Sequence, residues 1–142
     1  MSFVLDSSVA LTWCFEDERT PATQALLERV VESGAVVPVL WPLEVLNALV
    51  MAERRRRVDR DTRHRLAGLL RELPIRVDLE SAALAWTDTA GLAERHRLTL
   101  YDASYLELAR RLGLPLGTLD GDLRKAAKAG KVPLLGKGAP AF

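Results

Sequence analysis

The stretch Ser2-Phe-Val-Leu-Asp-Ser-Ser8 places a short apolar run directly before an acid and two hydroxyl side chains. Similar runs, rich in β-branched and aliphatic residues, recur at residues 35–39, 75–77, 116–119 and 132–135. Such runs are typical of short strands that are buried on both faces. Segments of helical periodicity lie between or after them, at residues 20–33, 42–57, 61–73, 81–96, 102–112 and 123–129.

The alternation of strands and helices predicts an α/β fold. Gly34 and Gly113 follow two of the helical segments, as C-terminal caps do, and Pro21 and Pro42 suit the first turn of a helix. Strands that are separated by helices form parallel sheets with right-handed crossovers. We therefore expect a three-layer sandwich, in which a short, mainly parallel β-sheet of four to five strands is flanked by helices.

Composition limits the class of protein without naming a partner. The net charge of +1 comes from 20 basic and 19 acidic residues among 142, so bulk charge neither requires nor excludes a polyanion. Cys14 is the only cysteine, which excludes an internal disulfide and suits the cytoplasm. No apolar run approaches the roughly 20 residues that span a bilayer. We expect one domain over residues 1–135 and a Gly-, Pro- and Ala-rich tail at 136–142.

Two acids directly follow predicted strands. Asp6 comes after Phe3-Val-Leu5, and Asp120 comes after Leu116-Gly-Thr-Leu119, with Asp122 two residues later. In open α/β sheets ligands bind outside the carboxyl ends of the strands, so acids at these positions are candidates for a site. Each acid could also be an ordinary helix cap or turn residue. Neither acid by itself distinguishes a ligand site from such a structural role.

Two further acids lie in predicted helices. Asp102 opens one of the helical segments, where capping alone would also explain it. Glu44 is the only charged residue between Ser33 and Glu53, and Asn47 follows it one turn later on the same face. A solvated glutamate on an amphipathic helix is the alternative for Glu44.

Such a fold would bring four acids together from both halves of the chain: Asp6, Glu44, Asp102 and Asp120. Clustered carboxylates repel one another and raise each other's pKa unless a cation neutralises them. Oxygen ligands without a Cys or His cluster favour Mg²⁺ or Mn²⁺ over zinc. His64 and His96 stand beside arginines in polar helical stretches, so we expect both at the surface.

Four motifs surround these acids, and their order along the chain is informative. They are Phe3-Val-Leu-Asp-Ser-Ser-Val-Ala-Leu11, Trp41-Pro-Leu-Glu-Val-Leu-Asn-Ala-Leu49, Leu98-Thr-Leu-Tyr-Asp-Ala-Ser-Tyr-Leu-Glu-Leu-Ala109 and Leu116-Gly-Thr-Leu-Asp-Gly-Asp-Leu123. Each is weak alone, but all four in register resemble the PIN-domain ribonucleases, and in particular the VapC toxins of bacterial and archaeal toxin–antitoxin pairs. The resemblance covers almost the whole chain, although residues 57–90 match only in helical character.

The resemblance implies roles for two sets of residues. The catalytic and metal-holding acids would be Asp6, Glu44, Asp102 and Asp120. The polar residues that support them would be Ser8, Asn47 and Thr118. Asp122 is a less settled metal ligand, because the family varies in whether a second acid occurs there. Gly121 stands where many relatives carry a basic residue, which would change how the substrate backbone is held.

The resemblance also implies an activity and partners. The expected activity is a Mg²⁺- or Mn²⁺-dependent endoribonuclease that hydrolyses RNA with metal-activated water, leaving a 5′-phosphate and a 3′-hydroxyl. The expected partners are an RNA substrate, a cognate VapB-like antitoxin that covers the site, and a second copy of the chain in a homodimer. The residues themselves reveal neither protein partner.

A nuclease needs positive charge beside its acidic pocket, because the binding of polyanions depends largely on Lys and Arg contacts with phosphates. The run Arg54-Arg55-Arg56-Arg57 is the candidate surface for RNA or for an acidic antitoxin segment. Arg55 falls on the helical stripe that carries Glu44. A solvated charged face is the alternative.

Two other functions use an acid after the first strand. A Mg²⁺-dependent phosphatase of the haloacid dehalogenase type wants a second acid two residues after the first, where this chain has Ser8. A non-catalytic, receiver-like binding module wants an acidic pair after the first strand, which is missing. Assays for RNA cleavage, for phosphatase turnover and for partner binding would distinguish the three functions.

Overall fold

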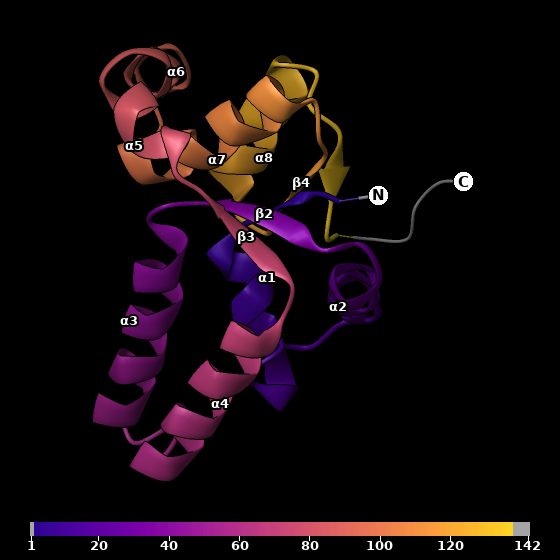
Figure 1. Cartoon of the computed structure of the whole chain (residues 1–142), viewed down its shortest axis with the longest axis vertical. Coiled ribbons are helices and arrows are strands. Elements are labelled where there is room, and N and C mark those ends of the chain that lie inside the picture. Colours follow the sequence, from indigo (N-terminus) through magenta and orange to yellow (C-terminus); the bar gives the residue numbers. More distant parts are fainter. Residues whose placement is uncertain (1, 138–142) are drawn as a thin grey trace.

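The computed structural model describes residues 2–137, which form a parallel sheet between two layers of helices (Figure 1). The strands are β1 (Val4–Leu5), β2 (Ala35–Pro38), β3 (Ile75–Asp78), β4 (Leu116–Gly117) and β5 (Leu134–Leu135). They pair in the order β3-β2-β1-β4-β5, and every pairing is parallel. The predicted three-layer α/β sandwich is therefore confirmed, with a sheet of five strands.

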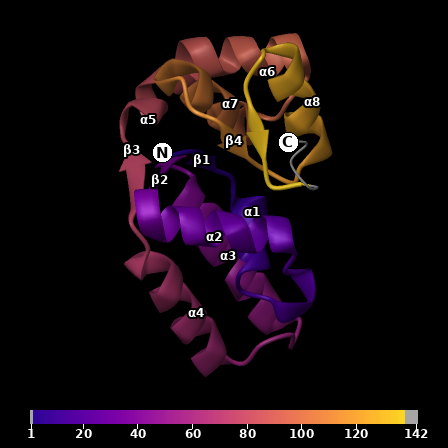
Figure 2. The same cartoon turned by 90° about the vertical axis from the view of Figure 1, so that its right-hand side faces the viewer.

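The helices divide between the two faces of the sheet (Figures 1 and 2). One face carries α1 (Ser7–Thr12), α2 (Pro21–Ser33), α3 (Trp41–Arg54) and α4 (Arg60–Glu72), with a 3₁₀ turn, η1 (Glu16–Glu18), between α1 and α2. The other face carries α5 (Glu80–Leu84), a π-helical turn (Ala85–Thr89), α6 (Ala90–His96), α7 (Leu100–Leu112) and α8 (Gly121–Ala129). No helix within residues 2–137 is long and apolar enough to cross a membrane.

The core lies on both sides of the short central strands. Phe3 and Leu5 from β1 and its flank are fully buried, as are Leu106 and Leu108 of α7, which packs directly on the sheet. Strands buried on both faces have no polar side to alternate with, which explains their continuous apolar sequences. Close packing also fixes Gly117 in β4, because a Cβ there would lie 2.9 Å from the Phe3 ring.

The predicted helix ends are mostly correct. Gly34 and Gly113 follow α2 and α7 with φ of 77° and 66°, a backbone region that glycine enters without strain. Pro21 begins α2, and Pro42 is the second residue of α3. The expected helix over residues 42–57 is too long at its C-terminus, since α3 ends at Arg54.

The single helix expected over residues 81–96 is not continuous in the structure. The helical segment begins at Glu80, and the π-helical turn Ala85–Thr89 interrupts it. A π turn adds one residue to a helical turn, and periodicity over a long window does not reveal such an insertion. Helix α1, only six residues long, is also too short to be recognised from periodicity. Ser7 and Ser8 are its first two residues.

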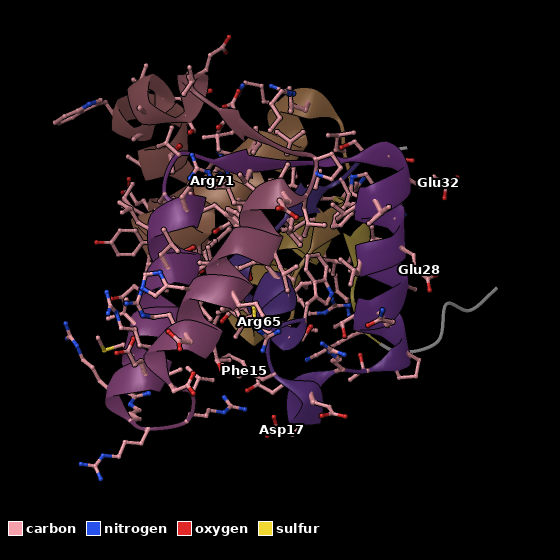
Figure 3. All side chains as sticks on the ribbon, turned by 60° about the horizontal axis from the view of Figure 1, so that its bottom comes forward. Phe15, Asp17, Glu28, Glu32, Arg65 and Arg71 are labelled. Carbon is pink, nitrogen blue, oxygen red and sulfur yellow. The ribbon has the colours of Figure 1, made fainter. Side chains whose placement is uncertain are left out.

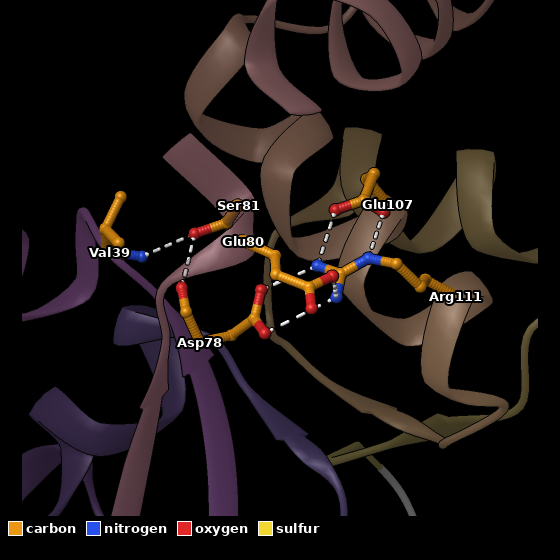
Figure 4. Close-up of polar contacts among 6 residues, drawn as sticks. All are labelled: Val39, Asp78, Glu80, Ser81, Glu107 and Arg111. Atoms are coloured by element: carbon orange, nitrogen blue, oxygen red, sulfur yellow. Dashed lines mark hydrogen bonds and ion pairs between the residues drawn. The ribbon is translucent and has the colours of Figure 1, made fainter. Parts of the chain in front are cut away.

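An ion cluster links the carboxyl end of β3 to α7 (Figure 4). Arg111 of α7 donates to Asp78 at 2.6 Å, to Glu107 at 2.7 Å and to Glu80 at 3.4 Å. Asp78 and Glu107 are buried, so the guanidinium compensates charges that water does not reach. Ser81 donates a further hydrogen bond to the Asp78 carbonyl at 2.7 Å.

The predicted domain limit at residue 135 stays a prediction. Residues 138–142 of the predicted tail lie outside the described residues.

Candidate active site

The order of the strands creates a switch point between β1 and β4. The chain builds β2 and β3 on one side of β1, and it places β4 and β5 on the other side. Val4 pairs with Leu116 and Leu5 with Gly117, so the residues that follow these two strands emerge side by side. Ligands of open α/β sheets bind at such a point, outside the carboxyl ends of the strands.

Asp6 lies at this switch point and is 4% exposed. The hydroxyls of Ser8 and Thr118 both donate to its Oδ2, at 2.6 and 2.7 Å, while Ser7 approaches Oδ1 at 3.4 Å. Burial raises the pKa of Asp6 above its usual value, the hydroxyl donors oppose this rise, and the charge of Asp120 adds to it. The two supporting residues therefore hold one carboxylate oxygen, Oδ2, while Ser7 contacts the other, Oδ1.

Ser8 and Thr118 also connect Asp6 to Asp120. The Leu119 amide donates to Ser8 Oγ at 3.0 Å, and the Asp120 amide donates to Thr118 Oγ1 at 3.0 Å. Asp120 caps α8 as its ordinary interpretation expects, because its Oδ2 accepts from the Leu123 amide at 2.8 Å. Capping uses one oxygen of Asp120, so it does not exclude a second role for the other.

Glu44 reaches the same region from the first turn of α3. The buried Tyr105 hydroxyl donates to its Oε1, and Ser7 Oγ donates to the same oxygen at 3.3 Å. Burial raises the pKa of Glu44, and the charge of Asp6 contributes to the rise. Burial and the two acids raise the pKa of Tyr105, so the phenol keeps its proton and remains a donor. Oε2 of Glu44 has no hydrogen-bond donor among residues 2–137.

Asp102 does not cap its helix, contrary to the interpretation that capping explains it. Helix α7 begins at Leu100, and Thr99 is the cap, whose hydroxyl accepts from the Asp102 amide at 3.1 Å. Burial is the largest cause that raises the pKa of Asp102, to about 6. Four neighbouring carboxylates add to that rise: Asp120, Asp6, Glu44 and Asp122. The carboxylate of Asp102 therefore makes no capping hydrogen bond, and it lies close to other negatively charged carboxylates.

These acids have no cationic partner in the described part of the chain. Asp6, Glu44, Asp102 and Asp120 form no ion pair with Lys or Arg there. Arg124, which is half-buried in α8, donates instead to the carbonyls of Thr118 and Leu135, at 2.7 and 3.0 Å. Within residues 2–137 no three His, Cys, Asp or Glu side chains are arranged to hold a metal as they stand. The site suits a hard cation by its oxygen donors, but not by their present spacing.

Residues 3–129 match the model of the PIN domain. The chain belongs to the PIN-domain family. Ribonuclease VapC3 of Pyrobaculum aerophilum is 29% identical over 123 residues, which cover 87% of this chain and 92% of that protein. The predicted family is therefore confirmed.

Solved structures share this PIN-domain fold. PAE2754 from Pyrobaculum aerophilum has a TM-score of 0.66 at 23% identity, with 89% of this chain and 84% of that chain covered. FitAcB from Neisseria gonorrhoeae has a TM-score of 0.63 at 16% identity, with 94% and 96% covered. VapC20 of Mycobacterium tuberculosis, described as a sarcin-ricin loop cleaving toxin, has a TM-score of 0.60 at 18% identity, with 89% and 95% covered.

Other predicted residues of this PIN domain lie apart from the acids. Asn47 is exposed, and no hydrogen bond joins its side chain to any residue of 2–137. The structure therefore shows no contact through which Asn47 would support the acids. Asp122 is exposed and acts on Asp102 through its charge. His64 is exposed as expected, but His96 is half-buried with an unpaired Nε2, which corrects its placement at the surface.

Two residues beside the acids of this PIN domain were not predicted from the sequence: Ser7, which donates to Glu44, and Tyr105. Tyr105 follows Asp102 by three residues in α7, so the two side chains lie on one face of the helix. That spacing was the available signal, but an aromatic residue on an apolar helix is ordinarily assigned to the core. Tyr105 is in fact buried with its hydroxyl directed to Glu44.

Proposed function

We propose that this protein is a Mg²⁺- or Mn²⁺-dependent endoribonuclease and the toxin of a VapBC-type pair. One observation carries the proposal: carboxylates from four separate elements gather at the switch point without a cationic partner in residues 2–137. A fold does not keep uncompensated charges together for stability, because like charges destabilise it. A divalent cation is the counter-charge that such a donor set fits.

The proposed ligands are Asp6, Glu44, Asp102 and Asp120. Asp6 offers Oδ1 and Glu44 offers Oε2, since hydroxyl donors already occupy their other oxygens. The half-buried carboxylates of Asp102 and Asp120 would have to move towards these two to complete the site. The metal supplies activation of a water and stabilisation of charge on the phosphate oxygens.

The chain's own residues prepare this chemistry. Ser8 and Thr118 orient Asp6, and Tyr105 with Ser7 orients Glu44, so two ligands are fixed before the substrate arrives. Asp102, which is half-exposed and makes no capping bond, accepts the proton of the attacking water. No histidine takes part in this proposal.

The partners and location are proposals of the same rank. We infer an RNA substrate, a VapB-like antitoxin that covers the acids, a homodimer and a cytoplasmic location, supported by the similarity to VapC3 and VapC20. Because VapC20 is described as cleaving the sarcin-ricin loop, ribosomal RNA belongs among the substrates to test.

The phosphatase alternative needs an acid where this chain has Ser8. The Ser8 hydroxyl instead donates a hydrogen bond to Asp6, which disfavours that alternative.

The decisive experiment incubates the purified protein, freed of antitoxin, with total RNA in Mg²⁺ or Mn²⁺. Parallel reactions contain EDTA or the Asp6→Asn variant, and the fragment ends are sequenced. Discrete 5′-phosphate fragments that disappear in both controls support the nuclease. A folded protein that binds metal yet leaves every RNA intact argues against it.

Replacing Tyr105 by phenylalanine should weaken Mn²⁺ binding by about tenfold, because Glu44 loses the donor that orients it. Loss of one buried hydrogen bond should also lower the free energy of unfolding by about 1–2 kcal/mol. Calorimetric titration with Mn²⁺ and urea denaturation measure the two effects separately.

Ser104→Ala is the matched control for Tyr105→Phe. Its hydroxyl is buried one residue away in α7, but it donates to the Tyr101 carbonyl at 2.6 Å rather than to an acid. The control should lose some stability and keep its affinity for Mn²⁺. Equal loss of affinity in both variants would show that Tyr105 acts only by supporting α7.

Metal and pH should act together on stability. The pKa values of Asp6, Glu44 and Asp102 are raised in the folded protein, so it holds their protons more tightly than the unfolded chain does. The stability that this confers is fully present below about pH 4 and is lost as the pH rises through about 6, the pKa of Asp102.

In EDTA the melting temperature should therefore be a few degrees lower at about pH 7.5 than at about pH 5, with partial exposure of Asp102 limiting the change. Added Mn²⁺ should restore it at the higher pH and have less effect at the lower, where Asp102 holds its proton. Thermal melts at both pH values measure this. A metal effect that is independent of pH would contradict the assignment of these acids as ligands.

A further inference from the structure

The four consecutive arginines at the C-terminal end of α3, Arg54 to Arg57, do not form one uniform surface. Arg57 is committed to the fold: it pairs with Asp17 at 2.8 Å and with Glu18 at 2.6 Å. Its guanidinium also lies over the Phe15 ring, 3.9 Å from the centroid. Phe15 and Asp17 lie together on the η1 side of the molecule (Figure 3). Arg57 therefore ties the turn between α3 and α4 to η1.

The other arginines of this turn point into solvent. Nitrogen-ended side chains extend outward from the turn between α3 and α4 (Figure 3). Four exposed arginines there have no ion-pair partner within residues 2–137: Arg54, Arg55, Arg56 and Arg60. We call these four residues the arginine surface.

Two of the acids close to the arginine surface are already occupied. Glu53 pairs with Arg63, and Asp59 caps α4 by accepting from the Thr62 amide at 2.7 Å. An open groove of about 380 Å³ is lined by these two acids together with Arg56, Arg57, Val58 and Arg60. Asp61 next to them stays exposed, so these four arginines leave the turn with an excess of positive charge.

The backbone supports this display. Arg56 has a φ of 60°, in the left-handed region that costs a non-glycine residue free energy. A glycine would remove that cost, but it would also remove a guanidinium from the groove. This left-handed residue ends α3, because the Arg57 amide donates back to the Ala52 carbonyl at 2.9 Å, and it leaves Arg56 exposed at the helix end.

Helix α3 connects the arginine surface to the acids. Glu44 stands in its first turn and Arg55 is its C-terminal cap residue. Eleven residues of helix advance by about 16 Å and rotate by about 20° beyond whole turns, so the two residues share one stripe. Arg55 is thus within a few nucleotides of the proposed metal site along a single helix face.

We propose that the arginine surface binds the phosphate backbone of single-stranded RNA several nucleotides away from the bond that is cut. The proposal rests on the proposed function and adds a binding surface to it. Four separate guanidinium groups spread along a turn match repeated phosphates, and the helical stripe of Arg55 leads to the acids. Such contacts bind RNA of any sequence, so this surface contributes affinity rather than sequence choice.

The test measures RNA binding without cleavage. A fluorescent single-stranded RNA is titrated in EDTA with the intact protein, with Arg54→Gln/Arg55→Gln/Arg56→Gln, and with Arg71→Gln/Arg76→Gln/Arg95→Gln. The second triple variant removes the same charge from exposed positions elsewhere. Fluorescence anisotropy between about 50 and 200 mM salt gives the affinity and its salt dependence.

The first triple variant should bind at least about tenfold more weakly and lose about two units of salt slope, because about 0.7 counterions are released per neutralised phosphate of a single strand. The second triple variant should stay within about twofold of the intact protein. Equal weakening in both variants, or none in the first, overturns the proposal. Retained RNA binding with loss of binding to a polyglutamate probe overturns it in favour of an acidic protein partner.

RNA cleavage by the intact protein in Mn²⁺ is followed in parallel. If the intact protein cleaves but the first triple variant binds RNA normally, only the arginine surface is wrong. If the intact protein does not cleave but the first triple variant has lost RNA binding, the surface stands and the nuclease does not.

Discussion

Replacing Asp6 by asparagine is expected to reduce metal-dependent RNA cleavage by about 10²–10³-fold or more. The amide would keep an oxygen for the donors Ser8 and Thr118, but it would lack the negative charge that a divalent cation needs. Initial rates on a defined RNA in Mn²⁺ measure the effect. The same variant should bind Mn²⁺ much more weakly in calorimetric titration.

Although Asp6→Asn should lose activity, it should not lose stability. Burial raises the pKa of Asp6, so the ionised carboxylate is held at a cost near neutral pH when no metal is present. In EDTA the variant should melt no lower than the intact protein, as is common when a functional charge is removed. Asp88→Asn, a change at an exposed acid of the π-helical turn, is the control and should keep full activity. An Asp6→Asn variant that cleaves at the normal rate would remove Asp6 from the site.

Replacing Arg111 by methionine is expected to lower the free energy of unfolding by about 2–4 kcal/mol, one of the largest stability effects in the chain. Methionine keeps much of the volume, but Asp78 and Glu107 are buried and would lose the cation that compensates them. Denaturation in urea at neutral pH measures the loss. The expected loss lies below that for a fully buried pair, because Arg111 itself is 21% exposed.

Two controls identify the cause of that loss. Arg110→Met changes the adjacent, exposed arginine and should alter stability by less than about 0.5 kcal/mol. Adding Glu107→Gln to Arg111→Met should restore part of the loss, since one uncompensated charge is then removed. A double variant that is less stable than the single one would mean that packing around residue 111, rather than charge, dominates.

Local patterns predicted most of the elements and the candidate acids of the site. The run at residues 2–8 identified β1 and Asp6 together, because a short apolar strand and the acid after it are adjacent in the chain. Glu44 stood out because it interrupts an apolar stretch, and Thr118 was assigned through the resemblance of its motif to the family. These features depend on neighbouring residues, which is why they are readable without a structure.

Longer-range features escaped the same reasoning. Tyr105 looked like a core residue, and only the tertiary arrangement of α7 and α3 directs its hydroxyl to Glu44, 61 positions away. Arg57 looked equivalent to its three neighbours until the fold brought Phe15 and Glu18 beside it. The ion cluster around Arg111 joins residues 33 positions apart, for which the sequence carries no periodic signal.

The amino-acid sequence by itself determined the alternation of strands and helices, the family and the identity of the candidate acids, because each of these is written in short contiguous patterns. Only the tertiary structure decided which oxygen of each acid is free, which residue orients Glu44, and which arginines remain available to a polyanion. Those properties depend on which side chains meet across the sheet and between helices. The strand order β3-β2-β1-β4-β5 governs the meeting at the switch point, and it is a property of the whole chain rather than of any segment.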